Sequence, residues 1–152
     1  HYVLGLTIGA AAAGGWIAVT GSFAPTAYAL WAGVGLWIAG FDILYATQDY
    51  TFDRAHGVKS IPARFGIPQA LRVARASHLL AWLAFLWAGV SYGAGPLYYL
   101  GLLLVGGLLL LEHRLVSPED LSKVEVAFFQ ANVGVSLGMF LFIVLDLLAR
   151  GA

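Results

Sequence analysis

The sequence predicts an all-α membrane protein, a polytopic bundle of helices that crosses the lipid bilayer several times. Of its 152 residues, 61% are hydrophobic and only 11% are charged. Soluble domains contain about 45–50% apolar and about 25% charged residues. The apolar residues also gather in stretches of about 20, the length that a helix needs to cross a bilayer. Together these observations exclude a water-soluble globular enzyme.

Five apolar stretches are long enough to be transmembrane helices. They occupy residues 3–20, 25–46, 68–92, 96–111 and 124–149. Prolines support this division, because the first turn of a helix has no need of the N–H group that proline lacks. Pro25, Pro68, Pro96 and Pro118 each lie where a helix is expected to begin. We expect a single domain over residues 1–152, with no separate soluble domain.

The basic residues lie mainly in connections on one side of the predicted bundle, the side that the chain reaches after the second span. That side receives Arg54, Lys59, Arg64, Arg72, Arg75, Arg114 and Lys123, whereas the other side receives Arg150. Loops rich in lysine and arginine remain in the cytoplasm. We therefore expect the long polar loop after the second span to face the cytoplasm.

Overall charge and cysteine content exclude several partners and chemistries. Eight basic residues balance eight acidic ones, so the chain lacks the basic footprint of a nucleic-acid-binding protein. It has no cysteine, which excludes disulfide bonds, thiolate metal sites and a cysteine nucleophile. The partner that the composition predicts is the lipid bilayer.

Residues 42–66 form a polar segment that differs from the rest of the chain. Asp42, Tyr45, Asp49 and Asp53 have the spacing i, i+3, i+7, i+11, which places them on one face of a continuous helix. Carboxylates near the membrane are costly and usually functional. Asp49 and Asp53 repel each other unless a cation lies between them, and Mg²⁺ binds a few carboxylates together with phosphate and water oxygens. We therefore expect these two residues to bind Mg²⁺.

Two basic residues, Lys59 and Arg64, follow the acidic pair and are positioned to meet anionic oxygens. Carboxylates, a metal ion and two cations at a membrane surface indicate a binding site for a lipid diphosphate. A solvated charged face is the alternative for Asp49 and Asp53. The apolar composition of the rest of the chain argues against that alternative.

The other ionisable residues are expected to be structural. His78 falls within the third span, where a histidine that packs between helices is more common than a ligand. Glu112, His113 and Arg114 are expected to form a charged collar at the membrane surface, with a part in closing the donor site as the alternative.

The motif D-x-x-Y-A-x-Q-D-x-x-x-D-x-x-x-G-x-K-S, from Asp42 to Ser60, resembles the second aspartate-rich motif of the UbiA superfamily of intramembrane aromatic prenyltransferases. The opening H-Y-V-L-G-L-T-I-G and the stretch G-W-I-A-V-T-G at residues 15–21 resemble the fifth helix of the bacterial 4-hydroxybenzoate polyprenyltransferase branch. E-H-R-L-V-S-P-E-D-L-S-K-V at residues 112–124 and A-F-F-Q-A-N at residues 127–132 resemble its last cytoplasmic loop and last helix.

The resemblance implies helices five to nine of a nine-helix enzyme of the bacterial inner membrane. The family's first aspartate-rich motif is absent, since the one asparagine, Asn132, has no acidic partner at that spacing. We therefore expect the chain to start within a longer domain at His1, to lack the four N-terminal helices and to be inactive alone. A split protein is the alternative origin.

The resemblance also implies a Mg²⁺-dependent transfer of a polyprenyl group from a polyprenyl diphosphate to an aromatic acid such as 4-hydroxybenzoate, in quinone biosynthesis. Asp49 and Asp53 are then expected to hold one metal ion, and Lys59 and Arg64 to neutralise the leaving diphosphate. Tyr45 is expected to stabilise an allylic cation. Asp42 is expected to position the acceptor or to accept its proton.

Three other functions compete with this hypothesis. A CDP-alcohol phosphotransferase requires an upstream Asp-Gly pair, which is missing. A prenyltransferase of the same fold with haem, chlorophyll or naphthoate as acceptor is disfavoured by residues 112–124. A transporter fragment would have charges spread through several spans, whereas here the acidic residues cluster at one membrane face.

Overall fold

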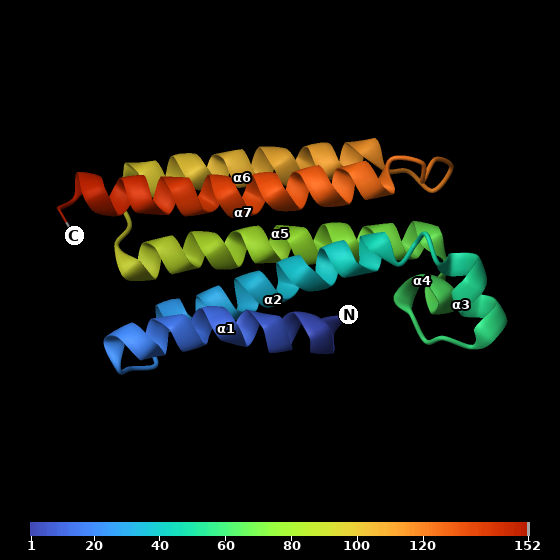
Figure 1. Cartoon of the computed structure of the whole chain (residues 1–152), viewed down its shortest axis with the longest axis horizontal. Helices are drawn as coiled ribbons and strands as arrows, with labels where there is room; N and C mark the ends of the chain where they lie inside the picture. Colours follow the sequence, from blue (N-terminus) through green and yellow to red (C-terminus); the bar gives the residue numbers. More distant parts are fainter. Residues whose placement is uncertain (152) are drawn as a thin grey trace.

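The computed structural model describes residues 1–151, which form seven helices and no strand. Five of them are long and apolar enough to cross a membrane, as the sequence predicts. These are α1 (Tyr2–Thr20), α2 (Pro25–Tyr45), α5 (Ile67–Tyr92), α6 (Pro96–Leu115) and α7 (Val124–Ala149). Two short helices, α3 (Tyr50–His56) and α4 (Ile61–Phe65), lie beyond the end of α2 (Figure 1).

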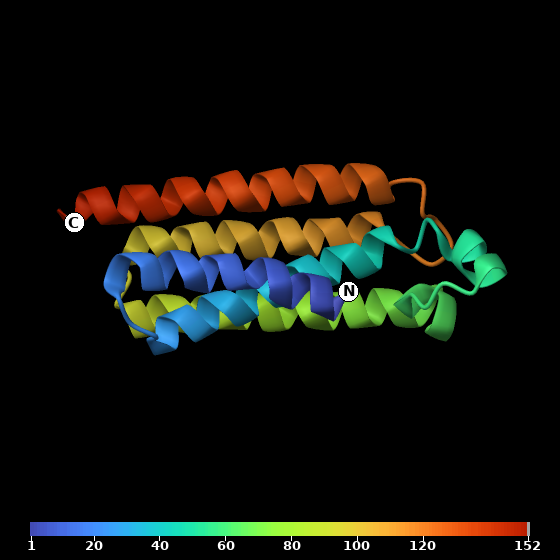
Figure 2. The same cartoon turned by 60° about the horizontal axis from the view of Figure 1, so that its bottom comes forward.

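The long helices pack in two groups. In the first, α2 packs between α1 and α5, and in the second α6 packs along α7. Figures 1 and 2 show α6 and α7 side by side in both views. The two groups meet where α5 faces α6 and where α2 faces α7, through smaller interfaces.

Glycine brings α1 and α2 into close contact. A Cβ atom added to Gly5 would lie 2.1 Å from the Gly35 carbonyl oxygen, and one added to Gly9 would lie 2.6 Å from the Trp31 carbonyl oxygen. Small residues at such crossings allow membrane helices to gain van der Waals contact along their backbones. Large apolar side chains on the outer surface remain open to lipid, and Leu79, Leu103 and Leu137 are each at least 60% exposed.

An apolar core holds together the end of the bundle that supports α3 and α4. It consists of buried residues from α2, α5, α7 and the loop before α7: Ile43, Leu44, Ala70, Leu71, Ala74, Val116, Val124 and Ala127. The loop between α6 and α7 reaches this same end (Figure 1). The polar segment at residues 42–66 is therefore supported by this apolar core.

The predicted place of Pro118 and the predicted end of α6 are wrong, whereas the other bounds agree to within one residue. The helix after Pro118 begins at Val124, because residues 117–120 form a turn in which the Ser117 hydroxyl accepts the Asp120 N–H at 3.1 Å. Pro118 therefore does not begin a helix. In addition, α6 continues four residues beyond the predicted limit of 111, to Leu115.

Candidate functional site

The polar segment after α2 is a turn followed by a new helix, so Asp42, Tyr45, Asp49 and Asp53 do not lie on one continuous helix. Successive N–H groups of Thr47, Gln48 and Asp49 bond three residues back rather than four. The buried Thr47 hydroxyl also donates to the Leu44 carbonyl at 2.7 Å. The Leu44 carbonyl, at the end of α2, thus accepts both the N–H and the hydroxyl of Thr47.

The two motif carboxylates lie in the first turn of α3. Asp49 is the exposed N-cap residue, and its carbonyl accepts the Asp53 N–H at 2.8 Å. Its side chain makes no capping hydrogen bond, which leaves the carboxylate available to a ligand. Asp53 is only 7% exposed, one helical turn further on. The i, i+4 relation of this acidic pair is therefore kept within α3.

A glycine turn brings the basic residues back towards Asp53. Gly57 ends α3 in the left-handed conformation, with φ at +70°, and the Val58 N–H then bonds the Asp53 carbonyl at 2.9 Å. Left-handed backbone favours glycine because it has no Cβ atom. Ser60 is the N-cap residue of α4, and its hydroxyl accepts the Ala63 N–H at 3.2 Å.

These two helix ends enclose an open pocket of about 360 Å³. Its lining includes Asp53, Arg54, Gly57, Val58, Lys59, Ala63 and Arg64. Three cationic side chains and one carboxylate give the pocket a net positive charge, which favours an anionic ligand. The structure thus brings Asp53, Lys59 and Arg64 together, while Asp49 lies one turn before this lining.

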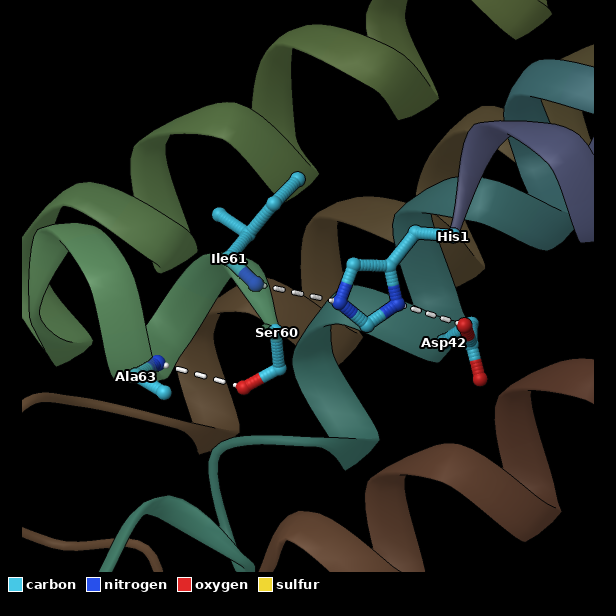
Figure 3. Close-up of polar contacts among 5 residues, drawn as sticks. All are labelled: His1, Asp42, Ser60, Ile61 and Ala63. Carbon is cyan, nitrogen blue, oxygen red and sulfur yellow. Dashed lines mark hydrogen bonds and ion pairs between the residues drawn. The ribbon is translucent and has the colours of Figure 1, made fainter. Parts of the chain in front are cut away.

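Asp42 lies in α2 and is bound to the beginning of α1 (Figure 3). The His1 Nδ1 atom and the Asp42 carboxylate are 2.5 Å apart. The other ring nitrogen of His1, Nε2, accepts the Ile61 N–H at 3.3 Å. Because Nε2 is an acceptor, Nδ1 bears the proton that Asp42 receives as a hydrogen bond. One imidazole therefore connects α2 with the beginning of α4.

Tyr45 belongs to an aromatic group between α2 and α7. Its ring centroid lies 4.7 Å from that of Phe128, and Phe128 lies 5.2 Å from Phe41. Trp37 continues this row at 5.8 Å from Phe41. The row provides aromatic faces next to the polar end of the bundle.

The sequence interpretation missed several members of these sites. The contact between His1 and Asp42 could not be predicted from sequence spacing. Arg54 lies within the motif, so its place in the pocket could have been predicted. The expectation of a charged collar is wrong for Glu112, which is 1% exposed. Glu112 lies between α5 and α6 together with His78 and His113.

The chain resembles known proteins over most of its length. The sequence model of the UbiA prenyltransferase family matches residues 1–143. The 4-hydroxybenzoate octaprenyltransferase of Nitrosospira multiformis is 34% identical over 122 residues, which cover 77% of this chain and 40% of that protein. The 4-hydroxybenzoate solanesyltransferase of a Synechocystis strain is 31% identical over 134 residues, covering 86% and 45% of the two chains.

A solved structure has the same fold. The apo structure of a UbiA homologue from Aeropyrum pernix K1 matches with a TM-score of 0.82 and 31% identity, over 97% of this chain and 55% of that one. The chain thus spans 40% to 55% of the length of these three proteins.

Proposed function

Because the chain belongs to the UbiA prenyltransferase family, we propose that it is the C-terminal part of an intramembrane enzyme. The enzyme transfers a polyprenyl group from a polyprenyl diphosphate to an aromatic acceptor such as 4-hydroxybenzoate. The four N-terminal helices of the family and its first aspartate-rich motif complete the domain, and this half alone is inactive. The proposal rests on the similarity to named prenyltransferases and on the pocket beside α3.

The pocket beside α3 binds the diphosphate. Lys59 and Arg64 line it together with Arg54, at the end of the bundle where most of the basic residues lie. Ammonium and guanidinium groups bind phosphate oxygens through charge-assisted hydrogen bonds. They also stabilise the negative charge that develops on the diphosphate as it leaves.

Asp49 and Asp53 bind Mg²⁺ at this pocket. Both residues belong to one helical turn, and Mg²⁺ needs only one or two protein carboxylates when phosphates and water complete its ligand shell. When bound, the ion neutralises diphosphate charge as a Lewis acid. The half-buried setting of the pair suits this role, because Asp53 is held by the fold and Asp49 faces water.

Tyr45 and Asp42 act on the prenyl group and on the aromatic acceptor. The bond between C1 of the prenyl chain and the diphosphate oxygen breaks, and its electron pair leaves with the diphosphate. The aromatic faces of Tyr45 and its neighbours stabilise the allylic cation. A ring carbon of the acceptor bonds to C1, and the ring proton passes to Asp42, which His1 holds in place. Alternatively, Asp42 orients the acceptor without accepting the proton.

The helices make the chain an integral membrane protein. We propose that it resides in a bacterial inner membrane with α3 and α4 in the cytoplasm. Seven of the eight basic residues lie on the side of α3 and α4, which favours this orientation by the positive-inside rule.

The decisive experiment replaces the metal-binding carboxylates in the full-length protein, reconstituted in vesicles with a polyprenyl diphosphate and labelled 4-hydroxybenzoate. Asp49→Asn and Asp53→Asn are each expected to lower kcat at least about 100-fold, because a charge stabiliser of the transition state is lost. Glu119→Gln, an exposed acid of the α6–α7 loop, is the matched control and is expected to leave turnover unchanged. Turnover at the control level in both aspartate variants would contradict the metal assignment.

A further inference from the structure

A second polar cluster lies between α5 and α6, away from the motif segment. His78 of α5 is 2% exposed and Glu112 of α6 is 1% exposed, and His113 lies beside them, largely buried. The His78 Nδ1 atom is 2.9 Å from His113 Nε2 and 3.4 Å from Glu112 Oε2. One atom from each side chain therefore meets the other two within 4.8 Å.

The carboxylate of Glu112 lacks a hydrogen-bond donor. Neither of its oxygens has a hydrogen-bond partner among residues 1–151. The nearby guanidinium group of Arg75 donates instead to the His113 carbonyl at 3.4 Å. A buried carboxylate is costly unless a cation or a hydrogen bond compensates for it. This arrangement points to a cation that binds the free oxygens.

The hydrogen bonds of His78 prepare one ring nitrogen to be a ligand. Its Nε2 atom is 3.2 Å from the Trp37 carbonyl oxygen, which can only accept, so Nε2 bears a proton. In the neutral ring the Nδ1 lone pair accepts the His113 Nε2–H at 2.9 Å and lies 3.4 Å from Glu112, so a metal ion would take the place of that proton. Metal-binding histidines typically donate their second ring N–H to a carbonyl in this way.

Gly40 of α2 makes this bond to the Trp37 carbonyl possible. A Cβ atom at this position would lie 2.2 Å from the His78 ring. The absence of a side chain there lets the imidazole reach the α2 backbone, so three helices contribute to the orientation of one ring.

The spacing and chemistry of the three side chains suit a transition metal. Ligands at about 2.0–2.1 Å from a tetrahedral Zn²⁺ ion lie about 3.3 Å from one another. The two short separations in the cluster, 2.9 Å and 3.4 Å, are close to this value. Two imidazoles with one carboxylate favour Zn²⁺ or a similar ion over Mg²⁺, which prefers oxygen ligands.

We propose that His78, Glu112 and His113 bind one Zn²⁺ ion that links α5 to α6. The site is separate from Asp49 and Asp53 and does not depend on the proposed prenyl transfer. An outer groove of about 790 Å³, lined by both histidines, gives the ion access and leaves its fourth position open to water. Because α6 packs mainly on α7, and α5 mainly on α2, the ion fastens the two helix groups to each other.

The test uses the full-length protein in detergent, purified through a tag without histidines. The protein is depleted of metal, incubated with Zn²⁺ or Co²⁺ in the presence of excess Mg²⁺, and desalted. We expect about one Zn²⁺ per chain by elemental analysis and the visible absorption of tetrahedral Co²⁺. Bound Zn²⁺ should also raise the Tm of the wild-type protein.

Variants assign the ion to the cluster. Glu112→Gln and His113→Gln are expected to lose the Co²⁺ spectrum, whereas the exposed controls His56→Gln and Glu119→Gln keep it. The double variant Asp49→Asn/Asp53→Asn should keep it as well. Failure of the wild-type protein to retain either ion would overturn the proposal, whatever the folding of the variants. So would a Co²⁺ spectrum that survives in both cluster variants.

Discussion

The segment from Asp49 to Arg64 faces water at the end of the bundle, whereas His78, Glu112 and His113 are enclosed between α5 and α6. The first region offers oxygen ligands and surplus cations around an open pocket. The second offers two nitrogen ligands and a single carboxylate, all largely buried beside the outer groove. In the two proposals, one chain presents a site for a hydrated ion with its phosphate ligand and another for a softer ion held by side chains.

Removal of metal by a chelator is expected to have the largest effect of all the changes that separate the exposed pocket from the buried cluster. EDTA is expected to abolish prenyl transfer by the full-length protein, because Mg²⁺ at Asp49 and Asp53 exchanges freely with solvent at an exposed pocket. Added Mg²⁺ should restore turnover. Labelled Zn²⁺ at the buried cluster should be released more slowly under the same treatment. Transfer that continues in EDTA, with Mg²⁺ absent by elemental analysis, would contradict the difference between the regions.

A smaller effect is expected from the cations of the pocket. Lys59→Met is expected to raise the KM for the polyprenyl diphosphate about ten- to hundredfold, since a hydrogen bond to a charged group contributes about 1.5–3 kcal/mol. Lys123→Met removes an exposed lysine from the loop before α7 and is the matched control. Equal KM values in the two variants would exclude Lys59 from donor binding. The KM for 4-hydroxybenzoate should change little in either.

The spans could be predicted because hydrophobicity is a local property of the sequence. All five predicted helices are present, and the fifth has the predicted bounds. The end of α6 was missed because Glu112, His113 and Arg114 lower its mean hydropathy, although Glu112 is buried. The end of α2 at Tyr45 is within one residue of the predicted limit of 46, and the local hydrogen bonds of Thr47 compete there with helix continuation.

The two candidate sites also differ in how far apart their residues lie in the sequence. The acidic pair and its basic neighbours lie within 16 residues of one another, so the motif could be found from spacing, and its catalytic roles stay predictions. His1 and Asp42 are 41 positions apart, and His78 and His113 are 35 apart. Contacts over such separations depend on how α1, α5 and α6 pack. That packing is fixed by tertiary contacts rather than by local pattern.

Gly40→Ala tests the buried cluster through the position of the His78 ring. The added methyl group would meet the His78 ring at 2.2 Å, so the ring must move away from the Trp37 carbonyl. Overpacking of this kind costs about 1–3 kcal/mol in unfolding free energy. Gly107→Ala is the matched control, because nothing lies within 4 Å of its added Cβ and it too is within a long helix. We expect reduced Tm and weaker Co²⁺ binding for Gly40→Ala alone, and a Tm equal to that of the control would argue against this contact.

The smallest effect is expected at Gly57, on the exposed side. Its φ of +70° makes an alanine strained by about 1–2 kcal/mol, although no atom lies within 4 Å of the added Cβ. Because α3 and α4 lie outside the long helices, this strain should loosen the turn between Asp53 and Lys59 without lowering the Tm of the bundle. We therefore expect a raised KM for the polyprenyl diphosphate and an unchanged Co²⁺ spectrum. Gly14→Ala, a helical glycine with an equally open surrounding, controls for the added methyl group. A donor KM equal to that of this control would show that the left-handed turn does not position Lys59, and the pocket would then have to form by another route.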